Sequence, residues 1–592
     1  MTRTAVLLTA LAGALVVATT QGCGSSNKAN IKTTTGTAGS SGGTTSGGAG
    51  SSMTGTAGSL SMSGGGGSST TNTGAAGTFV TGIGGCPLYQ APCGGKCTVI
   101  TNDAQNCGAC NNKCGANEVC AGGVCSKTCL AGAGLSGCSG ACVDKTTDNN
   151  NCGTCGTVCT GQTACIGGSC QAAKVFTAPA GTCTNGGAPA QVIAGGKNTC
   201  AGLIAQTAFT WSVCSCKNIN FEGDAYVDGW DSTRMAYVPM HLGGGLAADG
   251  TITSQSLADI WGQSWAASPM TSFNVSAYNV HHDLQSGGNI TCDMMDVTRD
   301  AYVAGNINGN MRVGGTLYQT PGKANGGLKV TARDVVVKPP CDCASPIPVA
   351  DIVAAGKTNN DNATIKLDPG IMSTNPGRVD LPCGRYYITG FSGGGTIVAH
   401  GSTVLFVDGS ISASGDLTIT VADSSSALDV FVTGTITATS TFNLGSPQFP
   451  ALTRLYIGGT QPLDIQSTLK IGAEIWAGNA VVNWESETDV WGAIFAGDLH
   501  VLSSLRLHHD QGITVAGENC EPPGPEGPGT GGMGGGAGTG GGTAGTPGGM
   551  CTSCKDCGNQ ACNNGTCGSC ATNADCCSPL MCSNGKCVYI IP

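Results

Sequence analysis

The sequence predicts an all-β protein, with a parallel β-solenoid (β-helix) body, small disulfide-rich modules and disordered Gly/Ser/Thr linkers. Three observations predict this class. Cysteine spacing repeats near the N-terminus, short runs of Val, Ile, Thr and aromatic residues alternate with Gly, Asn and Asp, and an aromatic signature recurs every 19–25 residues. Only 10% of residues are charged, and 98 of 592 are glycine. Such a composition is typical of extracellular β-rich surfaces and disfavours a helical enzyme.

Two blocks of seven cysteines have identical spacing and lie forty-five residues apart, each preceded by one more cysteine. Almost no aliphatic residues separate them, so disulfides must replace a hydrophobic core. The two modules, residues 86–128 and 129–171, contain Cys86, Cys93, Cys97, Cys107, Cys110, Cys114, Cys120 and Cys125, then Cys129, Cys138, Cys142, Cys152, Cys155, Cys159, Cys165 and Cys170. Eight cysteines allow 105 pairings, so spacing leaves the bridges open. This framework predicts an oxidising, extracytoplasmic compartment.

The N-terminus also predicts export. Residues 1–22 combine a short basic start with an apolar run too short to span a bilayer, as in a cleaved signal peptide. The segment Thr20-Gln21-Gly22-Cys23 resembles the bacterial lipobox, except that Thr20 stands where that motif prefers an aliphatic residue. The resemblance implies that Cys23 is lipidated and that the membrane is a partner through this anchor; the alternative is a secreted protein with Cys23 as a stray thiol. Residues 23–85 lack large apolar residues and predict a disordered tether.

Residues 172–520 form the longest segment able to bury a core, either as one unit or as two halves split near 341–350. An aromatic residue followed by two residues and glycine recurs at Tyr387, Phe406, Phe431 and Tyr456, and one residue shorter at Trp476 and Phe495. The repeat is too short for a β-α-β unit, so stacked β-coils are favoured, with a β-sandwich as the rival. We expect the aromatics to stack inside the coil and the glycines to occupy its corners.

The C-terminal part predicts a linker and a third cysteine module. Residues 521–550 are rich in Gly and Pro without a sustained collagen period, which predicts a disordered linker. Residues 551–592 contain Cys551, Cys554, Cys557, Cys562, Cys567, Cys570, Cys576, Cys577, Cys582 and Cys587. The whole chain has 36 cysteines, and 36 minus Cys23 leaves 35, so one thiol lacks a partner.

Three resemblances follow from these motifs. The blocks Cys93–Cys125 and Cys138–Cys170 look like the stigma-specific type of cysteine-rich repeat found in predicted bacterial surface lipoproteins. The segment Leu381–Gly390 and the closing Leu507–Asp510 look like bactofilin-like, polymer-forming β-helix repeats. The stretch Asp575–Cys587 resembles knottin-like and Dickkopf-type domains. Together these resemblances imply a structural or adhesive surface protein.

Metal and cofactor chemistry is not expected. The Cys-x-x-Cys pairs Cys107/Cys110 and Cys152/Cys155 have zinc-type spacing, yet no histidine precedes His241 and exported thiols oxidise, so disulfides are favoured. The start Cys551-x-x-Cys554-x-x-Cys557 lacks the rest of an iron–sulfur motif. The turn Asn359–Asn362 is expected to make Asx-turns rather than a calcium site.

Two His-His-Asp triplets, His281–Asp283 and His508–Asp510, contain side chains able to bind metal or transfer protons. Alternation on a strand would let the outer members of each triplet face outward together. The favoured interpretation is polar residues that end a strand. The cluster Asp296, Arg299 and Asp300 is likewise interpreted as a polar turn.

The function predicted is therefore non-enzymatic: a cell-surface or outer-membrane lipoprotein, structural or adhesive, that contacts a polysaccharide or surface protein. No hydrolase, zincin or nucleotide-binding motif is present. The net charge is −10 without a basic cluster, which disfavours nucleic acid. The first alternative is a β-helix carbohydrate-active enzyme. The second is a self-assembling filament or coat, although modules at both ends favour a monomer.

Overall fold

The computed structural model describes residues 86, 88–130, 133–183, 187–188, 190–232, 237, 239, 243–467 and 470–515, and four short strands between 561 and 588. The predicted signal peptide 1–22, the lipidation site Cys23, the tether to residue 85 and the linker 521–550 lie outside the described residues. So do Cys551, Cys554, Cys557, Cys570, Cys576 and Cys577. In the C-terminal module, the backbone places Cys562 opposite Cys567 and Cys582 opposite Cys587 in two antiparallel hairpins, β40 (Ala561–Asn563) with β41 (Thr566–Gly568) and β42 (Met581–Ser583) with β43 (Lys586–Val588).

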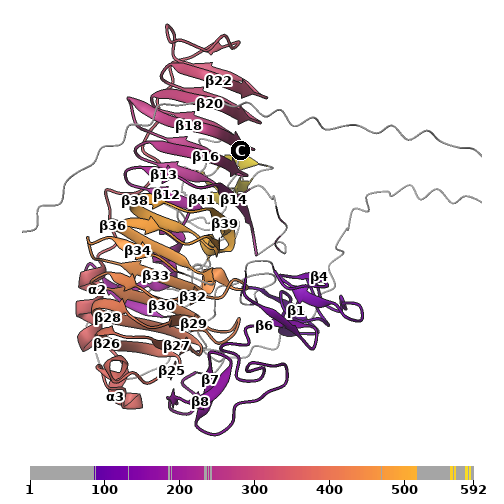
Figure 1. The fold of residues 1–592 in the computed structure, drawn as a ribbon, viewed down its shortest axis with the longest axis vertical. Helices are drawn as coiled ribbons and strands as arrows, with labels where there is room; N and C mark the ends of the chain where they lie inside the picture. Colours follow the sequence, from indigo (N-terminus) through magenta and orange to yellow (C-terminus); the bar gives the residue numbers. More distant parts are fainter. Residues whose placement is uncertain are drawn as a thin grey trace, which may run out of the picture. The chain divides into compact units, whose positions relative to one another are not determined.

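The body is all-β, and its strands pair in parallel ladders (Figure 1). The first segment contains β12 (Val213–Ser215), β13 (Ile219–Phe221), β14 (Ala225–Trp230), β15 (Leu246–Ala248), β16 (Ile252–Ile260), β17 (Ser264–Ala266), β18 (Thr271–Val280), β19 (Leu284–Ser286), β20 (Asn289–Val297), β21 (Ala301–Val303), β22 (Ile307–Val313), β23 (Leu317–Gln319) and β24 (Thr331–Ala332). Strand β16 pairs with β18, β18 with β20 and β20 with β22. Each strand therefore meets its counterpart 16–21 residues later in the chain.

The second segment of the body is built in the same way. It contains β25 (Arg378–Leu381), β26 (Gly384–Ser392), β27 (Gly395–Ala399), β28 (Ser402–Ala413), β29 (Leu417–Val421), β30 (Ala427–Val432), β31 (Ile436–Ala438), β32 (Phe442–Gly445), β33 (Thr453–Ile457), β34 (Leu463–Ile465), β35 (Ile471–Gly472), β36 (Glu474–Trp484), β37 (Thr488–Trp491), β38 (Ile494–Val501) and β39 (Leu505–Asp510). Strands β26, β28, β30 and β33 pair in succession, with aromatic residues at equivalent positions. Each aromatic signature in the sequence thus marks one strand, and these strands are neighbours in the same ladder.

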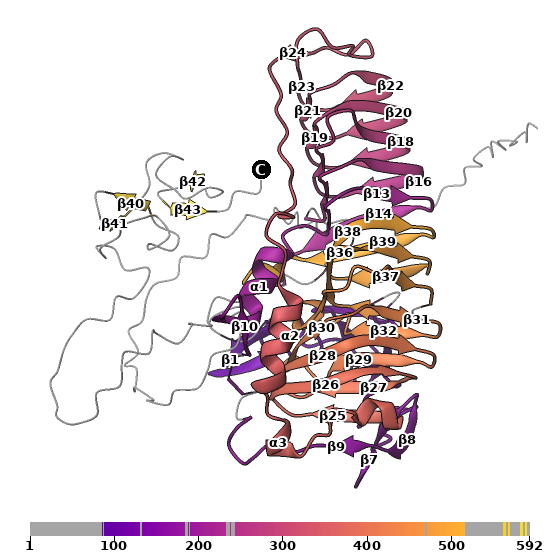
Figure 2. The same cartoon turned by 90° about the vertical axis from the view of Figure 1, so that its left-hand side faces the viewer.

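The two segments join in an order that differs from the chain order. Strands β38 and β39, at the end of the second segment, pair in parallel with β12, β13 and β14 at the start of the first. After β24 the chain returns along the ladders, as Figure 2 shows, and enters the second segment at the opposite end. Disulfides Cys214–Cys341 and Cys216–Cys343 fasten this returning segment. We call the β25 end lower and the β22 end upper, as in Figure 1.

Short helices accompany the strands. They are α1 (Ala201–Ala208), α2 (Val349–Thr358), α3 (Asn362–Ile365) and the 3-10 turns η3 (Ile371–Thr374), η4 (Pro450–Leu452) and η5 (Gln511–Val515). The sequence shows little overall helical periodicity, yet the buried residues of α2 are Val349, Ile352, Val353 and Gly356. This spacing places them on one helix face. None of the helices in the described residues has the length and apolar character that a membrane crossing requires.

The two N-terminal cysteine modules consist of short strands. These are β1 (Gln90–Cys93), β2 (Lys96–Val99), β3 (Val119–Ala121), β4 (Val124–Ser126), β5 (Ser136–Cys138), β6 (Ala141–Val143), β7 (Thr163–Ile166) and β8 (Ser169–Ala172). Strand β9 (Lys174–Val175) then pairs with β25 at the lower end of the ladders, while β10 (Gln191–Ala194) and β11 (Lys197–Cys200) form a hairpin before α1. The chain therefore passes from the second module directly into the body.

Candidate functional site

Each ladder presents outward side chains in a row, one residue from each strand, because alternate residues of a strand point to opposite sides. Three such rows run along the body. They differ in their chemistry and in what covers them, and this difference identifies the candidate binding surface.

The first row, the aromatic row, is covered by other parts of the chain. From the lower end it contains Tyr387, Phe406, Phe431, Tyr456, Trp476, Phe495, Cys214, Ala247, Trp265, Gln285, Tyr302 and Tyr318. The Phe431 and Tyr456 rings stack 4.6 Å apart, so the predicted aromatic stacking is confirmed. The predicted location inside the coil is wrong. A Cβ on Gly356 of α2 would lie only 2.4 Å from the Phe406 ring, so the stack lies under this helix.

The glycines that follow the aromatics allow close approach between neighbouring strands. A Cβ on Gly459 would lie 2.4 Å from the carbonyl oxygen of Gly434, and one on Gly434 would lie 2.9 Å from the carbonyl carbon of Gly409. Gly409 itself has φ of 124°, which L side chains rarely adopt. The glycines thus allow the close approach expected of them, but Gly409 lies within β28 rather than at a corner between strands.

The second row, the charged row, is covered only in its lower part. It contains Arg378, Thr396, Thr418, Asn443, Lys470, Asp489, Arg506, Tyr226, Asp259, Asn279, Asp296 and Arg312. Arg378 is buried and donates to the carbonyls of Thr147 and Cys165, at 2.7 and 2.8 Å. Lys470 pairs with Asp144. The second cysteine module thus docks on this row.

The first cysteine module docks beside the same row through Tyr89. This side chain is buried, and its hydroxyl donates to Asp510 Oδ2 at 2.7 Å while accepting from the amide of Ala451 at 3.1 Å. The nearby Glu474 is also fully buried. Burial, together with the negative charge of Asp510, raises the pKa of Glu474 well above its usual range. Burial likewise raises the pKa of Asp510.

The two His-His-Asp triplets lie along one line but form no shared site. His508 and Asp510 are buried rather than outward, because β14 pairs with β39 and the first module covers the strand end. His508 Nδ1 lies 2.6 Å from Asp228 Oδ1. The other triplet follows β18, as expected for the end of a strand. There His281 stacks on Trp261 at 3.8 Å.

The third row, the hydroxyl–amide row, has the greatest exposure. It contains Ser392, Ser412, Thr437, Asp464, Asn483, His500, Asn220, Thr253, Asn274, Thr291 and Asn308. All eleven side chains are exposed or half-buried. The residues on either side of each, such as Ile219 and Phe221 around Asn220, are mostly buried. Neighbouring members bond along the row: Thr253 Oγ1 donates to Asn220 Oδ1 at 2.5 Å and Asn483 Nδ2 to Asp464 Oδ1 at 2.7 Å.

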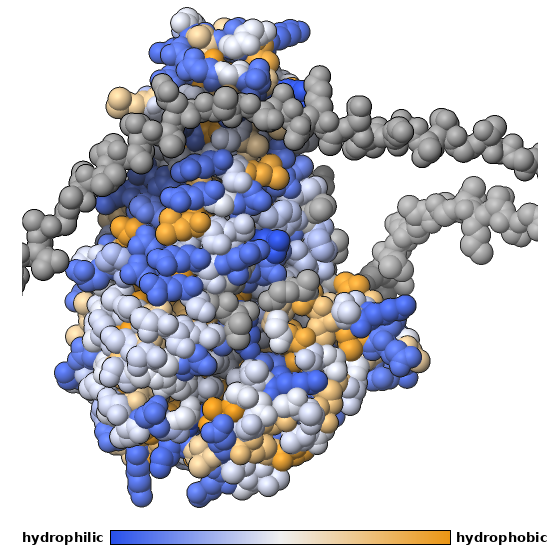
Figure 3. All heavy atoms as spheres, viewed as in Figure 1, coloured by the Kyte–Doolittle hydropathy of each residue, from blue (hydrophilic) through white to orange (hydrophobic). Residues whose placement is uncertain are grey.

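This row is continuous across the junction of the two segments. His500 on β38 lies opposite Asn220 on β13, so the polar side chains continue without a gap. Eleven strands spaced about 4.8 Å apart give a row roughly 48 Å long. The view in Figure 3 is predominantly hydrophilic over the strands, with scattered hydrophobic patches. Nine of its eleven side chains are hydroxyls or amides at a regular spacing, and the other two are Asp464 and His500.

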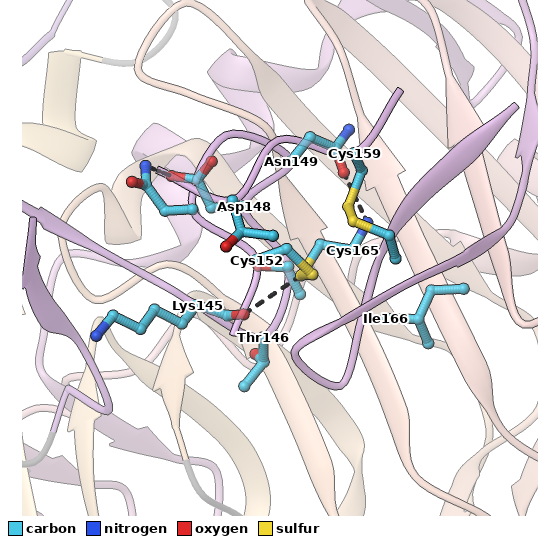
Figure 4. The surroundings of a disulfide bond; sticks show 12 residues. Lys145, Thr146, Asp148, Asn149, Cys152, Cys159, Cys165 and Ile166 are labelled. Carbon is cyan, nitrogen blue, oxygen red and sulfur yellow. Dashed lines mark hydrogen bonds between the residues drawn. A yellow bond between two sulfur atoms is a disulfide. The ribbon is translucent and has the colours of Figure 1, made fainter. Parts of the chain in front are cut away.

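The cysteines of the two N-terminal modules pair in the same pattern in both. The bridges are Cys86–Cys97, Cys93–Cys110, Cys107–Cys120 and Cys114–Cys125, then Cys129–Cys142, Cys138–Cys155, Cys152–Cys165 and Cys159–Cys170. Figure 4 shows the last two side by side, with Asn149 Oδ1 accepting the amide of Cys165 at 2.8 Å. Sulfurs of Cys152, Cys159 and Cys170 lie within 4.8 Å of one another, but they belong to disulfides, whereas zinc binds thiolates. The disulfides indicate an oxidising environment.

Several cysteines of the body were not among the predicted framework. Cys183 pairs with Cys383, Cys214 with Cys341 and Cys216 with Cys343, and Cys200 is also disulfide-bonded. A sequence signal existed for two of these bridges, because Cys214-x-Cys216 and Cys341-x-Cys343 have matching spacing. Cys292 is a buried free thiol within the described part of the chain.

The remaining predicted clusters serve local structure. Asn360 Oδ1 accepts the amide of Asn362, as in an Asx-turn, and Asn359 Nδ2 donates to Ala355 within the end of α2. Asn362 Nδ2 donates to the carbonyl of Tyr387 and so ties this turn to the body. Asp296 belongs to the charged row, 3.8 Å from Arg312. Arg299 and Asp300 lie in the following turn, where Asp300 Oδ1 accepts the amide of Thr316. The three residues of that cluster therefore do not converge.

Comparison with known proteins supports one of the resemblances. Residues 81–128 match the stigma-specific STIG1-like protein family, and residues 333–514 match a domain of unknown function (DUF7305). The first match covers the first cysteine module; the second covers the returning segment and the second strand segment. No curated protein and no solved structure matches the chain.

Proposed function

We propose that this protein is a non-enzymatic cell-surface lipoprotein with a structural or adhesive role, in which the parallel ladders form a β-solenoid that binds a polysaccharide. The observation that carries the proposal is the hydroxyl–amide row. The chain covers its aromatic row with helices and a disulfide-fastened segment, and the lower part of its charged row with cysteine modules. The hydroxyl–amide row keeps its side chains accessible along both segments.

A regular row of hydroxyls and amides suits an extended polymer of sugars. Each contact is weak, since one hydrogen bond contributes about 0.5–1.5 kcal/mol net. Many such contacts along one polymer add through multivalency, so affinity rises with polymer length. The predicted lipid anchor and tether would hold this row away from a membrane, with a reach of roughly 40–50 Å.

The test is retention of the disulfide-intact chain by a panel of insoluble polysaccharides and cell envelopes, with released sugar scored in the same samples. We expect retention without product. The variant Thr253→Ala/Asn274→Ala/Thr291→Ala removes three polar side chains of the row and is expected to lower affinity at least tenfold. The matched control, Asn279→Ala/Asp296→Ala, changes the charged row on β18 and β20 and is expected to retain binding. Equal binding by both variants would refute the assignment to this row.

A β-helix carbohydrate enzyme is the second candidate, favoured by the upper part of the charged row. Asp259 and Asp296 occupy this row with Asn279 between them. Two strand spacings separate their backbones by roughly 9.6 Å. Asp259 Oδ1 lies 2.8 Å from His281 Nε2. New reducing ends or unsaturated sugars in the retention assay, abolished in the Asn279→Ala/Asp296→Ala variant, would establish this candidate.

A further inference from the structure

The charge around the hydroxyl–amide row narrows the class of polymer that it can bind. Beside this row run two further outward columns, two residues before and two residues after each member. The column before contains Gly390, Ser410, Thr435, Pro462, Val481, Asp498, Asn218, Thr251, Thr271, Asn289 and Asn306; Thr271 stands three residues before Asn274 because the register shifts there. The column after contains Gly394, Ser414, Thr439, Gln466, Glu485, Leu502, Glu222, Gln255, Ser276, Asp293 and Asn310.

The row and its two flanking columns contain carboxylates but no lysine or arginine. The acidic residues are Asp464 in the row, Asp498 before it, and Glu485, Glu222 and Asp293 after it. Glu222 and Glu485 are exposed. They lie on either side of Leu502, because β36, β38 and β13 are successive strands of this ladder. The basic side chains of the ladders lie elsewhere, for example Arg506 and Arg312 in the charged row.

Apolar side chains also border this surface. Leu502 is 44% exposed. Leu257 on β16 and Met294 on β20, which align with each other through Ala277, are 44% and 45% exposed. Scattered exposed apolar residues are ordinary. Here, however, they adjoin a row in which nine of eleven side chains are uncharged hydroxyls or amides. Hydroxyl and amide groups beside apolar side chains match a polymer that presents hydroxyls at its edges and C–H groups on its ring faces.

From this charge pattern we infer that the ligand of the hydroxyl–amide row is an uncharged polysaccharide rather than an acidic one; the inference rests on the proposed function. A carboxylate-bearing or sulfated polymer would place its charges opposite Glu222, Glu485 and Asp464, with no lysine or arginine in the row or its two flanking columns to neutralise them. The nearby groups that can carry a positive charge lie beside the column before the row: His500 is 3.7 Å from Asp498, and the exposed Lys217 adjoins Asn218. Like-charge repulsion of this kind is screened by salt, with a Debye length of about 10 Å at 0.1 M. An uncharged polymer has no such cost, so its binding should not depend on ionic strength.

The test compares retention of the disulfide-intact chain on insoluble cellulose and chitin, on calcium-free cross-linked polygalacturonate and alginate, and on chitosan, each between about 20 and 500 mM salt. We expect at least tenfold tighter binding to an uncharged polymer than to either acidic one, with no salt dependence. Equal or tighter binding to the acidic polymers would overturn the inference while the proposed function stands. Salt-sensitive binding to chitosan alone would also overturn it, in favour of a cationic ligand. Retention by none of these polymers or by cell envelopes would refute the proposed function itself.

A charge-reversal variant separates repulsion from other causes. Glu222→Lys/Glu485→Lys should raise retention on polygalacturonate at least tenfold at low salt and change retention on the uncharged polymer much less. The control Asp351→Lys changes an exposed carboxylate on α2. This control should leave retention on polygalacturonate and on the uncharged polymer unchanged. If the two variants behave alike on polygalacturonate, charge at this row does not select the ligand.

Discussion

The aromatic row and the hydroxyl–amide row run along the same body and share strands β26, β28, β36 and β38, yet they meet opposite surroundings. Phe431 on β30 is fully buried under the helical layer, whereas Thr437, six residues later on β31, is exposed. Exposing large apolar rings to water costs free energy, so the chain covers them with α2 and the returning segment. Hydroxyls and amides are satisfied by solvent and need no cover. The comparison teaches that repeated outward side chains can serve the protein's own packing or a ligand, and that their chemistry decides which.

Removing both disulfides that hold the returning segment should lower the unfolding free energy more than any other change considered below. Replacing Cys214, Cys216, Cys341 and Cys343 by serine opens a loop with a sequence separation of 127 residues. On the loop-entropy model this costs about 5 kcal/mol of unfolding free energy. Cys341→Ser alone should cost much less, because the neighbouring disulfide still closes nearly the same loop. Denaturant unfolding measures the loss of unfolding free energy in the quadruple variant and in Cys341→Ser. Similar losses in the two would contradict the prediction that either disulfide alone closes the loop.

A cavity in the aromatic row should cause the next largest loss of unfolding free energy. Phe431→Ala removes a fully buried ring that stacks 4.6 Å from Tyr456. We expect a loss of about 3–5 kcal/mol in unfolding free energy. The matched change Thr437→Ala in the hydroxyl–amide row should stay within about 0.5 kcal/mol. Comparable losses in the two variants would show that exposure does not distinguish the rows.

The docking of the first cysteine module should depend on one hydroxyl. Tyr89→Phe keeps the buried ring but leaves Asp510 and the amide of Ala451 without this partner. The expected cost is about 1–3 kcal/mol, the usual penalty for an unsatisfied buried group. Limited proteolysis between the module and the body provides a second readout. Unchanged stability and unchanged cleavage would mean that the module is held by other contacts.

The buried carboxyl Glu474 should produce a pH dependence of opposite sign to that of a salt-bridged acid. Its pKa is raised in the folded protein, so the folded state holds a proton that the unfolded chain releases above about pH 4.3. Unfolding free energy should therefore fall as pH rises from that value towards the folded pKa, by up to about 1.4 kcal/mol per pH unit from this group. Subtracting the Glu474→Gln profile from that of the natural chain isolates the effect. A difference that is flat with pH would contradict the burial argument.

The sequence predicted the parts that depend on local chemistry. Cysteine spacing identified both modules and the oxidising environment, and the run of aromatic-x-x-Gly signatures identified the strand repeat. It could not tell which side of a strand faces inward, because residues on both sides of β30, such as Val430 and Phe431, are buried. Nor could it show the junction of β39 with β14, which joins residues 280 positions apart, His508 and Asp228.

The hydroxyl–amide row was missed although a signal exists. Its members stand between two apolar residues, as in Ile219-Asn220-Phe221, Phe273-Asn274-Val275 and Leu463-Asp464-Ile465. Each triplet alone resembles any half-buried strand. Only the register, which aligns strands from both segments, shows that the polar residues share one surface. The triplet His508–Asp510 ends β39, as predicted, but the sequence could not show that His508 is buried, since the strand and module that cover it are distant in sequence.

Carboxyl labelling of the polysaccharide-bound chain tests the central claim most directly. Asp464, Glu222 and Glu485 lie in or beside the hydroxyl–amide row, and the exposed Asp351 on α2 lies on the helix that covers the aromatic row. Carbodiimide-coupled amine labelling, read by mass spectrometry with and without the retained polymer, reports which carboxylates the polymer shields. The proposed function predicts protection of Asp464, Glu222 and Glu485 and unchanged labelling of Asp351. Protection of Asp351 with unaltered labelling of the other three would contradict it.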